Sequence, residues 1–235
     1  MGKKGLELFL TEAKEIGCQT PKLRVIEKND IPIISGELDL VSENEGVKDT
    51  YAIEILPTAH YPSRFPLVFE TGGRIPRNID WHIFESTGHC CIKTLPEEIL
   101  ICKNGITLSH FIETEVIPYF FNQTFRRLKG YFLNERSHGI SGEIEFFKSE
   151  LITDNILDIV KWLQFILQRK EPSRSEKRCF CGSQLMYRHC HREAYRKLAK
   201  LGNAELQYFI KKITESEEFI TAYLKRENNN TIIRL

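Results

Sequence analysis

Two cysteine clusters contain the residues best suited to chemistry in this chain. The first cluster is the run Gly88-His89-Cys90-Cys91-Ile92, and the second extends from Cys179 to His191. A cysteine thiolate in a loop is a strong nucleophile for acyl transfer. Three thiolates and one imidazole instead form the ligand set of a tetrahedral zinc site. The sequence therefore indicates a candidate nucleophile in the middle of the chain and a candidate metal site near its end.

The second cluster has the spacing of a closed metal site. Cys179 and Cys181 are separated by one residue, and Cys190 and His191 follow after eight more. Four protein ligands leave no coordination position for water, so we expect a structural zinc ion. The segment is too short to bury a core of its own without metal. Two alternatives stay open: His189 in place of His191 as the imidazole ligand, and free thiols without metal.

The composition is typical of a folded protein. The chain has 235 residues, of which 41% are hydrophobic and 28% charged, and this length predicts one domain plus an appendage. Its first residues are too few and too charged for a secretion signal, and no apolar stretch is long enough to span a bilayer. We therefore expect a cytoplasmic protein with no membrane partner. The seven cysteines are then expected to be thiols or metal ligands rather than disulfides.

Charge is distributed unevenly along the chain. The overall net charge is +1, but residues 169–200 contain ten basic and three acidic residues, a net charge of +7 that leaves −6 for the rest. A basic segment of this kind fits nucleic acid, an acidic protein surface or simply a solvated face around the metal site. No row of aromatic residues accompanies the charges, so nucleic acid is the least favoured of the three.

Regular periodicity surrounds the first cluster. Apolar residues at helical spacing predict a helix over residues 5–17 that ends at Gly17. Alternating apolar and polar residues predict strands at 34–40 and 51–55, and residues 23–27 and 67–69 are two further strand candidates. The short links between these strands favour an antiparallel meander with one solvent-exposed face, against whose other face the helix can pack.

The segment 70–99 has no periodicity and contains both Cys90 and Cys91. Long irregular segments inside compact domains tend to be functional. Helices are predicted to follow at 108–116, from Pro118 through Phe132, from a cap at Thr153 or Asp154 through Leu167, and from a cap at Asn203 through Leu224, with a polar linker over 168–177.

In the order of these elements and in several motifs, the chain resembles the ubiquitin-conjugating enzyme family. Tyr61-Pro62 and the run from Phe65 to Phe69 resemble that family's entry into its fourth strand, and the central cluster resembles its Gly-x-aliphatic-Cys-Leu motif. The run from Glu70 to Arg77, then His82, Cys90-Cys91 and His138-Gly139-Ile140-Ser141-Gly142 resemble a bacterial branch found in defence and conjugation operons. The resemblance covers residues 1–150 and implies an α+β ubiquitin-conjugating-enzyme-like fold, a four-stranded antiparallel meander with flanking helices.

The resemblance implies roles for individual residues. Cys91 matches the nucleophile that carries an acyl group as a thioester, and Cys90 matches an aliphatic position, where a small buried side chain is expected. His82 fits either a catalytic or a structural hydrogen-bonding role. The family stabilises its tetrahedral oxyanion with an Asn shortly before the cysteine, but Phe84 stands where that donor is expected. Asn78 is a substitute only if the loop folds back, and His82 and His89 are the nearer candidates.

The implied activity is that of a transferase. Cys91 would accept a ubiquitin-like protein from an activating enzyme, or the C-terminus of another protein, and pass it to an amine. In the bacterial operons the transferred protein can be a cyclic-oligonucleotide synthase (CD-NTase) of CBASS-type antiphage signalling. The competing hypothesis is a catalytically inactive adaptor that retains the fold and binds a partner protein.

The terminal cluster resembles the SEC-C motif, which is appended to many bacterial proteins. The resemblance assigns Cys179, Cys181, Cys190 and His191 as ligands of a structural zinc. It implies a small helical zinc module over residues 171–235, joined to the first domain by a helix and linker at 151–170. Its expected task is recognition, with positive charge presented by Arg188, Arg192, Arg196 and Lys197.

Overall fold

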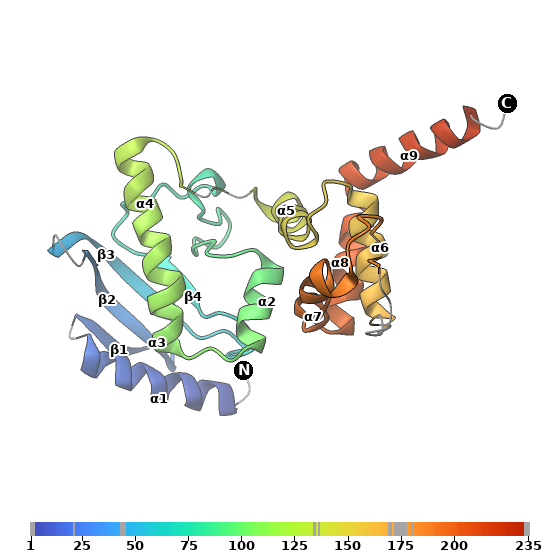
Figure 1. The fold of residues 1–235 in the computed structure, drawn as a ribbon. Coiled ribbons are helices and arrows are strands. Elements are labelled where there is room, and N and C mark those ends of the chain that lie inside the picture. Colours follow the sequence, from blue (N-terminus) through green and yellow to red (C-terminus); the bar gives the residue numbers. More distant parts are fainter. Residues whose placement is uncertain are drawn as a thin grey trace. The chain divides into compact units, whose positions relative to one another are not determined.

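The computed structural model describes residues 3–20, 22–42, 46–133, 135, 137–168, 171, 178–179 and 181–232. The chain divides into two compact units, with Met1–Lys93 and Ile101–Glu135 in unit 1, and Thr94–Leu100 and Arg136–Leu235 in unit 2 (Figure 1). None of the described helices combines the length and the apolar character required to cross a bilayer.

Unit 1 is built on a four-stranded antiparallel sheet. The strands lie in the order β1-β2-β3-β4 and cover Leu23–Lys28, Ile31–Ser42, Gly46–Leu56 and Leu67–Glu70. Cross-strand pairs such as Ile34 with Ile55 and Leu38 with Tyr51 join side chains that are all buried. The predicted α+β class and antiparallel meander are therefore confirmed, with an apolar face directed into the core.

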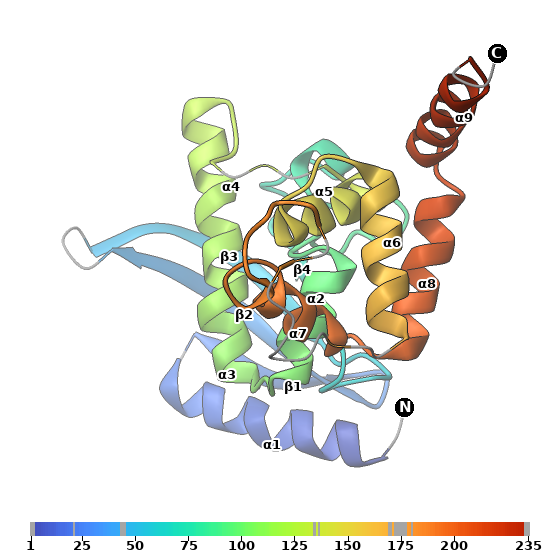
Figure 2. The ribbon, with the colours of Figure 1, turned by 45° about the vertical axis from the view of Figure 1, so that its right-hand side comes forward.

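Helices complete the core of unit 1. α1 (Lys3–Gln19) contributes Phe9, Ala13 and Ile16 to the same buried cluster as the strands. Its predicted end at Gly17 is wrong by two residues, because the helix continues to Gln19. α4 (Ile117–Lys129) lies across the sheet, where the ring of Phe120 is 4.7 Å from that of Tyr51 (Figures 1 and 2).

The segment before α4 differs from the prediction of two separate helices. α3 (Leu108–Phe111), a π-helical turn η2 (Ile112–Val116) and α4 follow one another without a break. Pro118 lies in the first turn of α4, where its missing N–H is tolerated, and the wider π turn precedes it. The run ends at Lys129 rather than Phe132, because Gly130 adopts φ 88° and terminates the helix.

Unit 2 is helical in the part that the structure describes. It contains α5 (Gly139–Leu151), α6 (Ile156–Leu167), η3 (Tyr187–His189), α7 (Arg192–Ala199), α8 (Asn203–Thr214) and α9 (Glu217–Ile232). α2 (Leu95–Lys103) begins in unit 2 and ends in unit 1. α6 and α8 lie side by side (Figure 2). Most of the helices share a core whose largest fully buried side chains are Phe147 and Phe209.

Two predicted caps in unit 2 are wrong. Asn155, not Thr153 or Asp154, caps α6, since its side chain accepts from the N–H of Leu157. The single helix predicted from Asn203 is two helices, because Ser216 accepts a hydrogen bond from the N–H of Phe219 and donates one to Ile213. Asn203 is the first residue of α8 and Gly202 takes the cap position.

The cysteine-rich segment shares a core with helices that precede it in the chain. Cys179, Tyr187 and Leu198 are buried in the same cluster as residues of α5 and α6. α5 accordingly lies in unit 2, although the sequence places it within the domain at 1–150. Of the predicted linker 168–177, residues 169–170 and 172–177 lie outside the described residues.

Candidate active site and candidate metal centre

The loop that contains Cys91 is tied to the sheet by backbone hydrogen bonds. The N–H of Cys90 donates to the carbonyl of Val68 on β4 at 2.7 Å, and isolated bridges pair Phe69 with His89 and Ile83 with Cys90. The N–H of Cys91 donates to the carbonyl of His82 at 2.7 Å. The backbone of the loop is therefore paired with β4 on one side and with residues 82–83 on the other.

The two adjacent cysteines have different environments. Cys90 is 5% exposed and belongs to the core of unit 1. Burial raises the pKa of its thiol to about 12, so this side chain is neutral near pH 7. Cys91 is only partly buried. The prediction that Cys90 is a packed small residue is confirmed; the nucleophilic role of Cys91 stays a prediction.

His82 is held next to Cys91 in an unusual backbone conformation. It ends the short 3-10 helix η1 (Ile79–Trp81) with φ 53° and ψ 38°, in the left-handed region. A ring nitrogen of His82 and the Sγ of Cys91 lie within 4.8 Å of one another. The His82 ring also packs edge-on against Phe132, with centroids 4.7 Å apart. The structure therefore brings together the two residues predicted to be catalytic.

The loop does fold back on Asn78. Its carbonyl accepts from the N–H groups of Trp81 and Ile83, and its side-chain oxygen caps η1 by accepting from the N–H of Trp81 at 3.1 Å. Asn78 is therefore committed to the turn through its oxygen, and its role as an oxyanion donor stays a hypothesis. Phe84 stacks on His89 with ring centroids 4.4 Å apart.

His89 contacts Thr87 in addition to the ring of Phe84. Its Nδ1 lies 2.6 Å from the hydroxyl of Thr87, and burial lowers the pKa of its imidazole. A neutral imidazole in such a position can accept the Thr87 hydrogen bond.

Arg77 braces the tip of the loop. Its guanidinium donates to the carbonyls of Glu85 at 2.9 Å and Ser86 at 3.1 Å. Gly88 has φ 81°, and a Cβ at this position would meet the Arg77 guanidinium carbon at 3.2 Å. A glycine is required here both by the backbone conformation and by the approach of Arg77.

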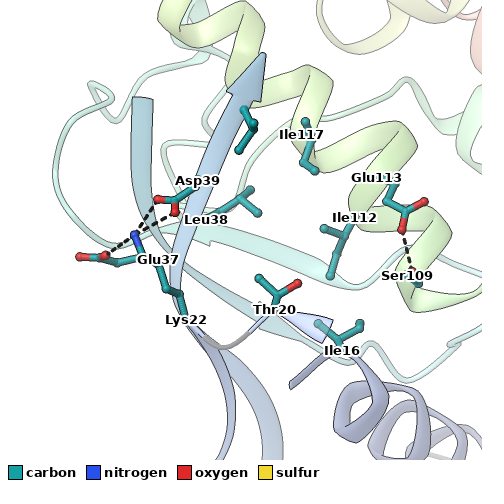
Figure 3. Close-up of a pocket in the computed structure, with 11 residues that line it drawn as sticks. Ile16, Thr20, Lys22, Glu37, Leu38, Asp39, Ser109, Ile112, Glu113 and Ile117 are labelled. Carbon is teal, nitrogen blue, oxygen red and sulfur yellow. Dashed lines mark hydrogen bonds and ion pairs between the residues drawn. The ribbon is translucent and has the colours of Figure 1, made fainter. Parts of the chain in front are cut away.

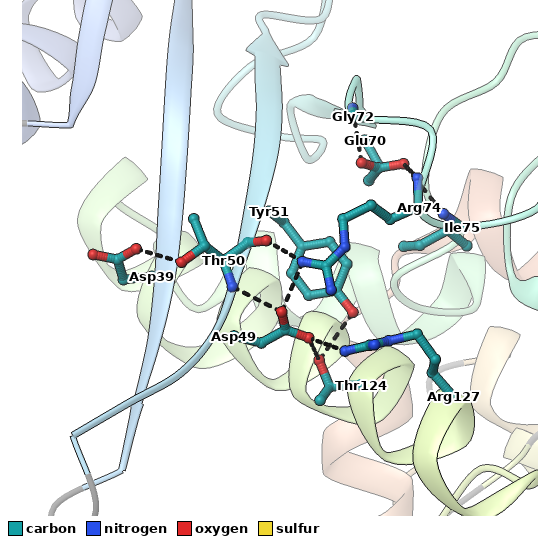
Figure 4. Close-up of polar contacts among 10 residues, drawn as sticks. All are labelled: Asp39, Asp49, Thr50, Tyr51, Glu70, Gly72, Arg74, Ile75, Thr124 and Arg127. Atoms are coloured by element: carbon teal, nitrogen blue, oxygen red, sulfur yellow. Dashed lines mark hydrogen bonds and ion pairs between the residues drawn. The ribbon is translucent and has the colours of Figure 1, made fainter.

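A buried carboxylate joins the start of the loop to β3 and α4 (Figure 4). Asp49 accepts from Arg74 at 2.7 Å, Arg127 at 2.6 Å and Thr124 at 2.8 Å. Burial alone would raise the pKa of Asp49, but the hydrogen bonds from Arg74 and Thr124 prevail and lower it to about 2. Glu70 adds bonds from the N–H groups of Gly72 and Arg74. Sequence reasoning did not single out Asp49.

Unit 1 also has an open pocket away from the cysteine loop (Figure 3). Its volume is about 520 Å³, and it lies between α1, β2 and the helical run from α3 to α4. Apolar side chains of Ile16, Leu38 and Ile112 line it, and the ion pair of Lys22 with Asp39 is at its edge.

The terminal cysteines and His191 converge in unit 2. Sγ of Cys179 lies 3.4 Å from Nδ1 of His191, Sγ of Cys190 lies 3.0 Å from the same nitrogen, and the sulfurs of Cys181 and Cys190 are 3.6 Å apart. In a tetrahedral zinc site with bonds of about 2.3 Å to sulfur, neighbouring ligand atoms are separated by roughly 3.5–3.8 Å. This group of four could hold a metal ion.

The imidazole of His191 is oriented for ligation. Its Nε2 donates to the carbonyl of Leu151 at 2.8 Å, which leaves Nδ1 directed at the sulfurs. Trp162 stacks on the ring with centroids 4.3 Å apart. His189 lies outside the cluster, and its Nε2 accepts from Arg188 at 3.0 Å. The geometry therefore favours His191 over His189.

The thiols of this cluster differ in acidity. Burial raises the pKa of Cys179 to about 12. Burial also acts to raise the pKa of Cys181, but hydrogen bonds with Ser183, Cys179 and Cys190 outweigh it and lower the pKa to about 6. Ser183 Oγ lies 3.1 Å from the Cys181 sulfur and 3.4 Å from that of Cys190. Ser183 thus favours the thiolate form that metal binding requires.

The basic side chains around this cluster are largely paired with acids. Arg196 lies 2.9 Å and Arg192 3.9 Å from Glu171, and Lys197 lies 2.6 Å from Glu150. These ion pairs reduce the positive charge that the sequence predicts for this face.

Fold and sites together define a class: an α+β protein with a four-stranded antiparallel sheet, a half-buried cysteine beside an imidazole, and a second cluster of three cysteines and one histidine. No model of a known protein family matches the chain, and a search of curated proteins finds no match.

Proposed function

We propose that this chain is a ubiquitin-conjugating-like transferase that carries an acyl group as a thioester on Cys91 and passes it to an amine. The observation that supports this most directly is the contrast within the cysteine pair. Cys90 is buried in the core, whereas Cys91 is partly exposed with a ring nitrogen of His82 within 4.8 Å of its sulfur. An imidazole at this distance can take the thiol proton after a small movement.

The proposed reaction has two steps. The Cys91 thiolate attacks the carbonyl of an activated acyl carrier, forms the new C–S bond and expels the carrier's thiolate, which takes up the proton. An amine then attacks the thioester, the C–S bond breaks, and the amine proton leaves through His82 or water while Cys91 is regenerated. No oxidant or reductant is needed.

The resemblance to the bacterial branch supplies the proposed partners. The acyl group would be the C-terminus of a ubiquitin-like protein delivered by an activating enzyme, or that of a cyclic-oligonucleotide synthase in antiphage signalling. The transfer would take place in the cytoplasm.

The terminal cluster is proposed to hold structural zinc. Three sulfurs and an imidazole nitrogen fit the ligand preference of this metal, and the bond from His191 to Leu151 fixes the required tautomer. Cys179, Cys181, Cys190 and His191 would be the ligands. The metal would stabilise unit 2 and take no part in acyl transfer.

A synthetic thioester tests the acyl-transfer proposal without knowledge of the natural donor. The protein is incubated with a fluorescent acyl thioester of 2-mercaptoethanesulfonate, and the adduct is analysed with and without reductant. We expect a reductant-sensitive adduct that Cys91→Ala abolishes and Cys90→Ala retains. An adduct that persists in Cys91→Ala would overturn the assignment.

The position of Phe84 favours a second candidate, an inactive adaptor. The family's oxyanion donor is expected here, and Phe84 instead stacks on His89. The adaptor hypothesis predicts that Cys91→Ala retains full biological activity, whereas the transferase hypothesis predicts its loss.

A further inference from the structure

One face of α4 binds three consecutive backbone carbonyls next to the candidate nucleophile. Tyr119 donates its hydroxyl to the carbonyl of His82 at 2.9 Å, and Gln123 donates its amide to the carbonyl of Trp81 at 2.8 Å. Arg126 donates its guanidinium to the carbonyl of Asp80. We call Tyr119, Gln123 and Arg126 the donor row.

The spacing of the donor row explains how it matches the turn. Its members are four and three residues apart, so they lie on one face of a helix, about one turn from each other. The three carbonyls belong to successive residues of η1 and its cap, and the order is reversed along the two segments. Each donor therefore binds a different peptide group, and together they fix the whole turn.

This turn has a conformation that requires such support. His82 is a non-glycine residue with φ 53°, a left-handed conformation that is strained for a residue with a Cβ. Its carbonyl accepts two hydrogen bonds, one from Tyr119 and one from the N–H of Cys91. The same peptide group thus joins α4, the His82 turn and the backbone of Cys91.

If the donor row served only to pack α4 against the turn, apolar side chains would be more stable there. Gln123 is 2% exposed, and its side-chain oxygen has no hydrogen-bond partner among the described residues. A buried polar group with an unsatisfied acceptor is destabilising compared with an apolar residue of the same size. Its amide nitrogen nevertheless holds the Trp81 carbonyl. Arg126 adds a cation–π contact, with its guanidinium carbon 4.3 Å from the centre of the Trp81 ring.

We propose that Tyr119, Gln123 and Arg126 are positioning residues that hold the His82 imidazole beside the Cys91 thiol by binding the carbonyls of residues 80–82. This inference rests on the proposed function, because it assigns a purpose to the pairing of His82 with Cys91. The donor row binds backbone carbonyls, and Tyr119 also hydrogen-bonds with the buried thiol of Cys90. The donor row acts through the backbone of His82, whose ring direction follows from its left-handed φ and ψ.

The experiment measures the reactivity of the Cys91 thiol itself. The full-length protein is alkylated with iodoacetamide at pH values from 5 to 10, and tandem mass spectrometry separates modification of Cys91 from that of Cys90. The titratable or charged side chains around this turn include Cys90, Tyr119 and Arg126 in unit 1. The variants are Tyr119→Phe, Gln123→Met and Arg126→Met. Tyr131→Phe is the matched control, because Tyr131 is 59% exposed and lies beyond the end of α4.

We expect Tyr119→Phe and Gln123→Met to move the midpoint of the Cys91 profile upward by about half a unit or more, which lowers the rate at neutral pH about threefold. Tyr131→Phe should follow the wild-type profile. Arg126→Lys should shift the midpoint of the Cys91 profile less than Arg126→Met does, because lysine keeps a cationic donor. Near-ultraviolet circular dichroism of each variant shows whether unit 1 is folded.

Wild-type profiles in folded Tyr119→Phe, Gln123→Met and Arg126→Met would overturn the proposal. If the two buried substitutions unfold unit 1, the comparison of Arg126→Met with Arg126→Lys decides, since Arg126 is only half-buried. Alkylation needs no acyl donor, so an absent thioester with a shifted profile would refute the transferase and leave the donor row supported.

Discussion

The cysteine loop of unit 1 and the cysteine cluster of unit 2 reach their geometry by different means. The cluster takes all its candidate ligands from residues 179–191, and one local knuckle brings them together. The loop depends on distant residues: Tyr119 is 37 positions from His82, and Arg126 is 46 positions from Asp80. The candidate ligands of the cluster thus lie close together in the sequence, whereas the loop is held by residues of a sheet and a helix that lie far from it in the sequence.

Removing the proposed zinc ion should produce the largest effect, and only in unit 2. Structural zinc contributes about 10–16 kcal/mol to small zinc domains, and we expect a smaller but still dominant loss here, above about 3 kcal/mol, because Cys179 shares the core of α5 and α6. The chain has two tryptophans, Trp81 in unit 1 and Trp162 in unit 2. Trp162 stacks on His191, so its fluorescence reports on the cluster.

The measurement follows chelator-induced changes in two single-tryptophan variants. Trp81→Phe leaves Trp162 as the reporter, and Trp162→Phe leaves Trp81. We expect a strong change from Trp162 and little from Trp81. Cys179→Ser should reproduce the effect of chelator. An equal response of both tryptophans would contradict the local character of the cluster.

Breaking the Asp49 network should produce the largest effect in unit 1. Asp49→Asn removes a buried charge that pairs with Arg74 and Arg127, and we expect a loss of about 2–3 kcal/mol in the free energy of unfolding. Asp39→Asn is the matched control. Its ion pair with Lys22 is more exposed, and it should cost less than about 1 kcal/mol.

The same carboxylate predicts a pH dependence. Its pKa is lowered from 3.8 to about 2 in the folded protein, a difference of about 2 kcal/mol. A lowered pKa means that this stabilisation is present above pH 3.8 and is lost as the pH falls toward 2. Urea unfolding of wild type and Asp49→Asn across this window should show the difference between them shrinking. A constant difference would contradict the role of the charge.

The contrast between the two regions also decides what the sequence could predict. The ligand set of the cluster was readable because spacing within thirteen residues defines it. The meander was predictable for the same reason, because the alternation of apolar residues lies within each short strand. The hydrogen bonds of Asp49 to Thr124 and Arg127 span 75 and 78 residues, and nothing local marks the partners. Gln123 is buried on the same helix face as Tyr119, Phe120 and Thr124, and nothing near it in the sequence marks it as a donor to the Trp81 carbonyl.

Gly88→Ala should produce an intermediate effect. The backbone at Gly88 is left-handed, which strains any residue with a Cβ, and the added Cβ would lie 3.2 Å from the Arg77 guanidinium carbon. We therefore expect the free energy of unfolding to fall by about 2 kcal/mol. Gly105→Ala is the control, because Gly105 has φ 88° with nothing within 4 Å of the added Cβ. Its loss should be about 1 kcal/mol, the cost of the backbone conformation alone. If urea unfolding shows the same loss of stability for Gly88→Ala and Gly105→Ala, Arg77 does not brace the loop.

Cys90→Ala should produce the smallest change in stability, about 1 kcal/mol, since a small buried side chain loses one sulfur atom. Its effect on chemistry should be smaller still. Because burial raises the pKa of Cys90 to about 12, its thiolate is scarce at pH 8 and iodoacetamide should modify Cys91 far faster. Cys90→Ala should therefore leave the rate of alkylation in the loop unchanged, while Cys91→Ala should abolish the fast alkylation. If Cys90 reacts as fast as Cys91 in the folded protein, the loop does not separate a packed thiol from a reactive one, and the distinction on which the transferase proposal depends is lost.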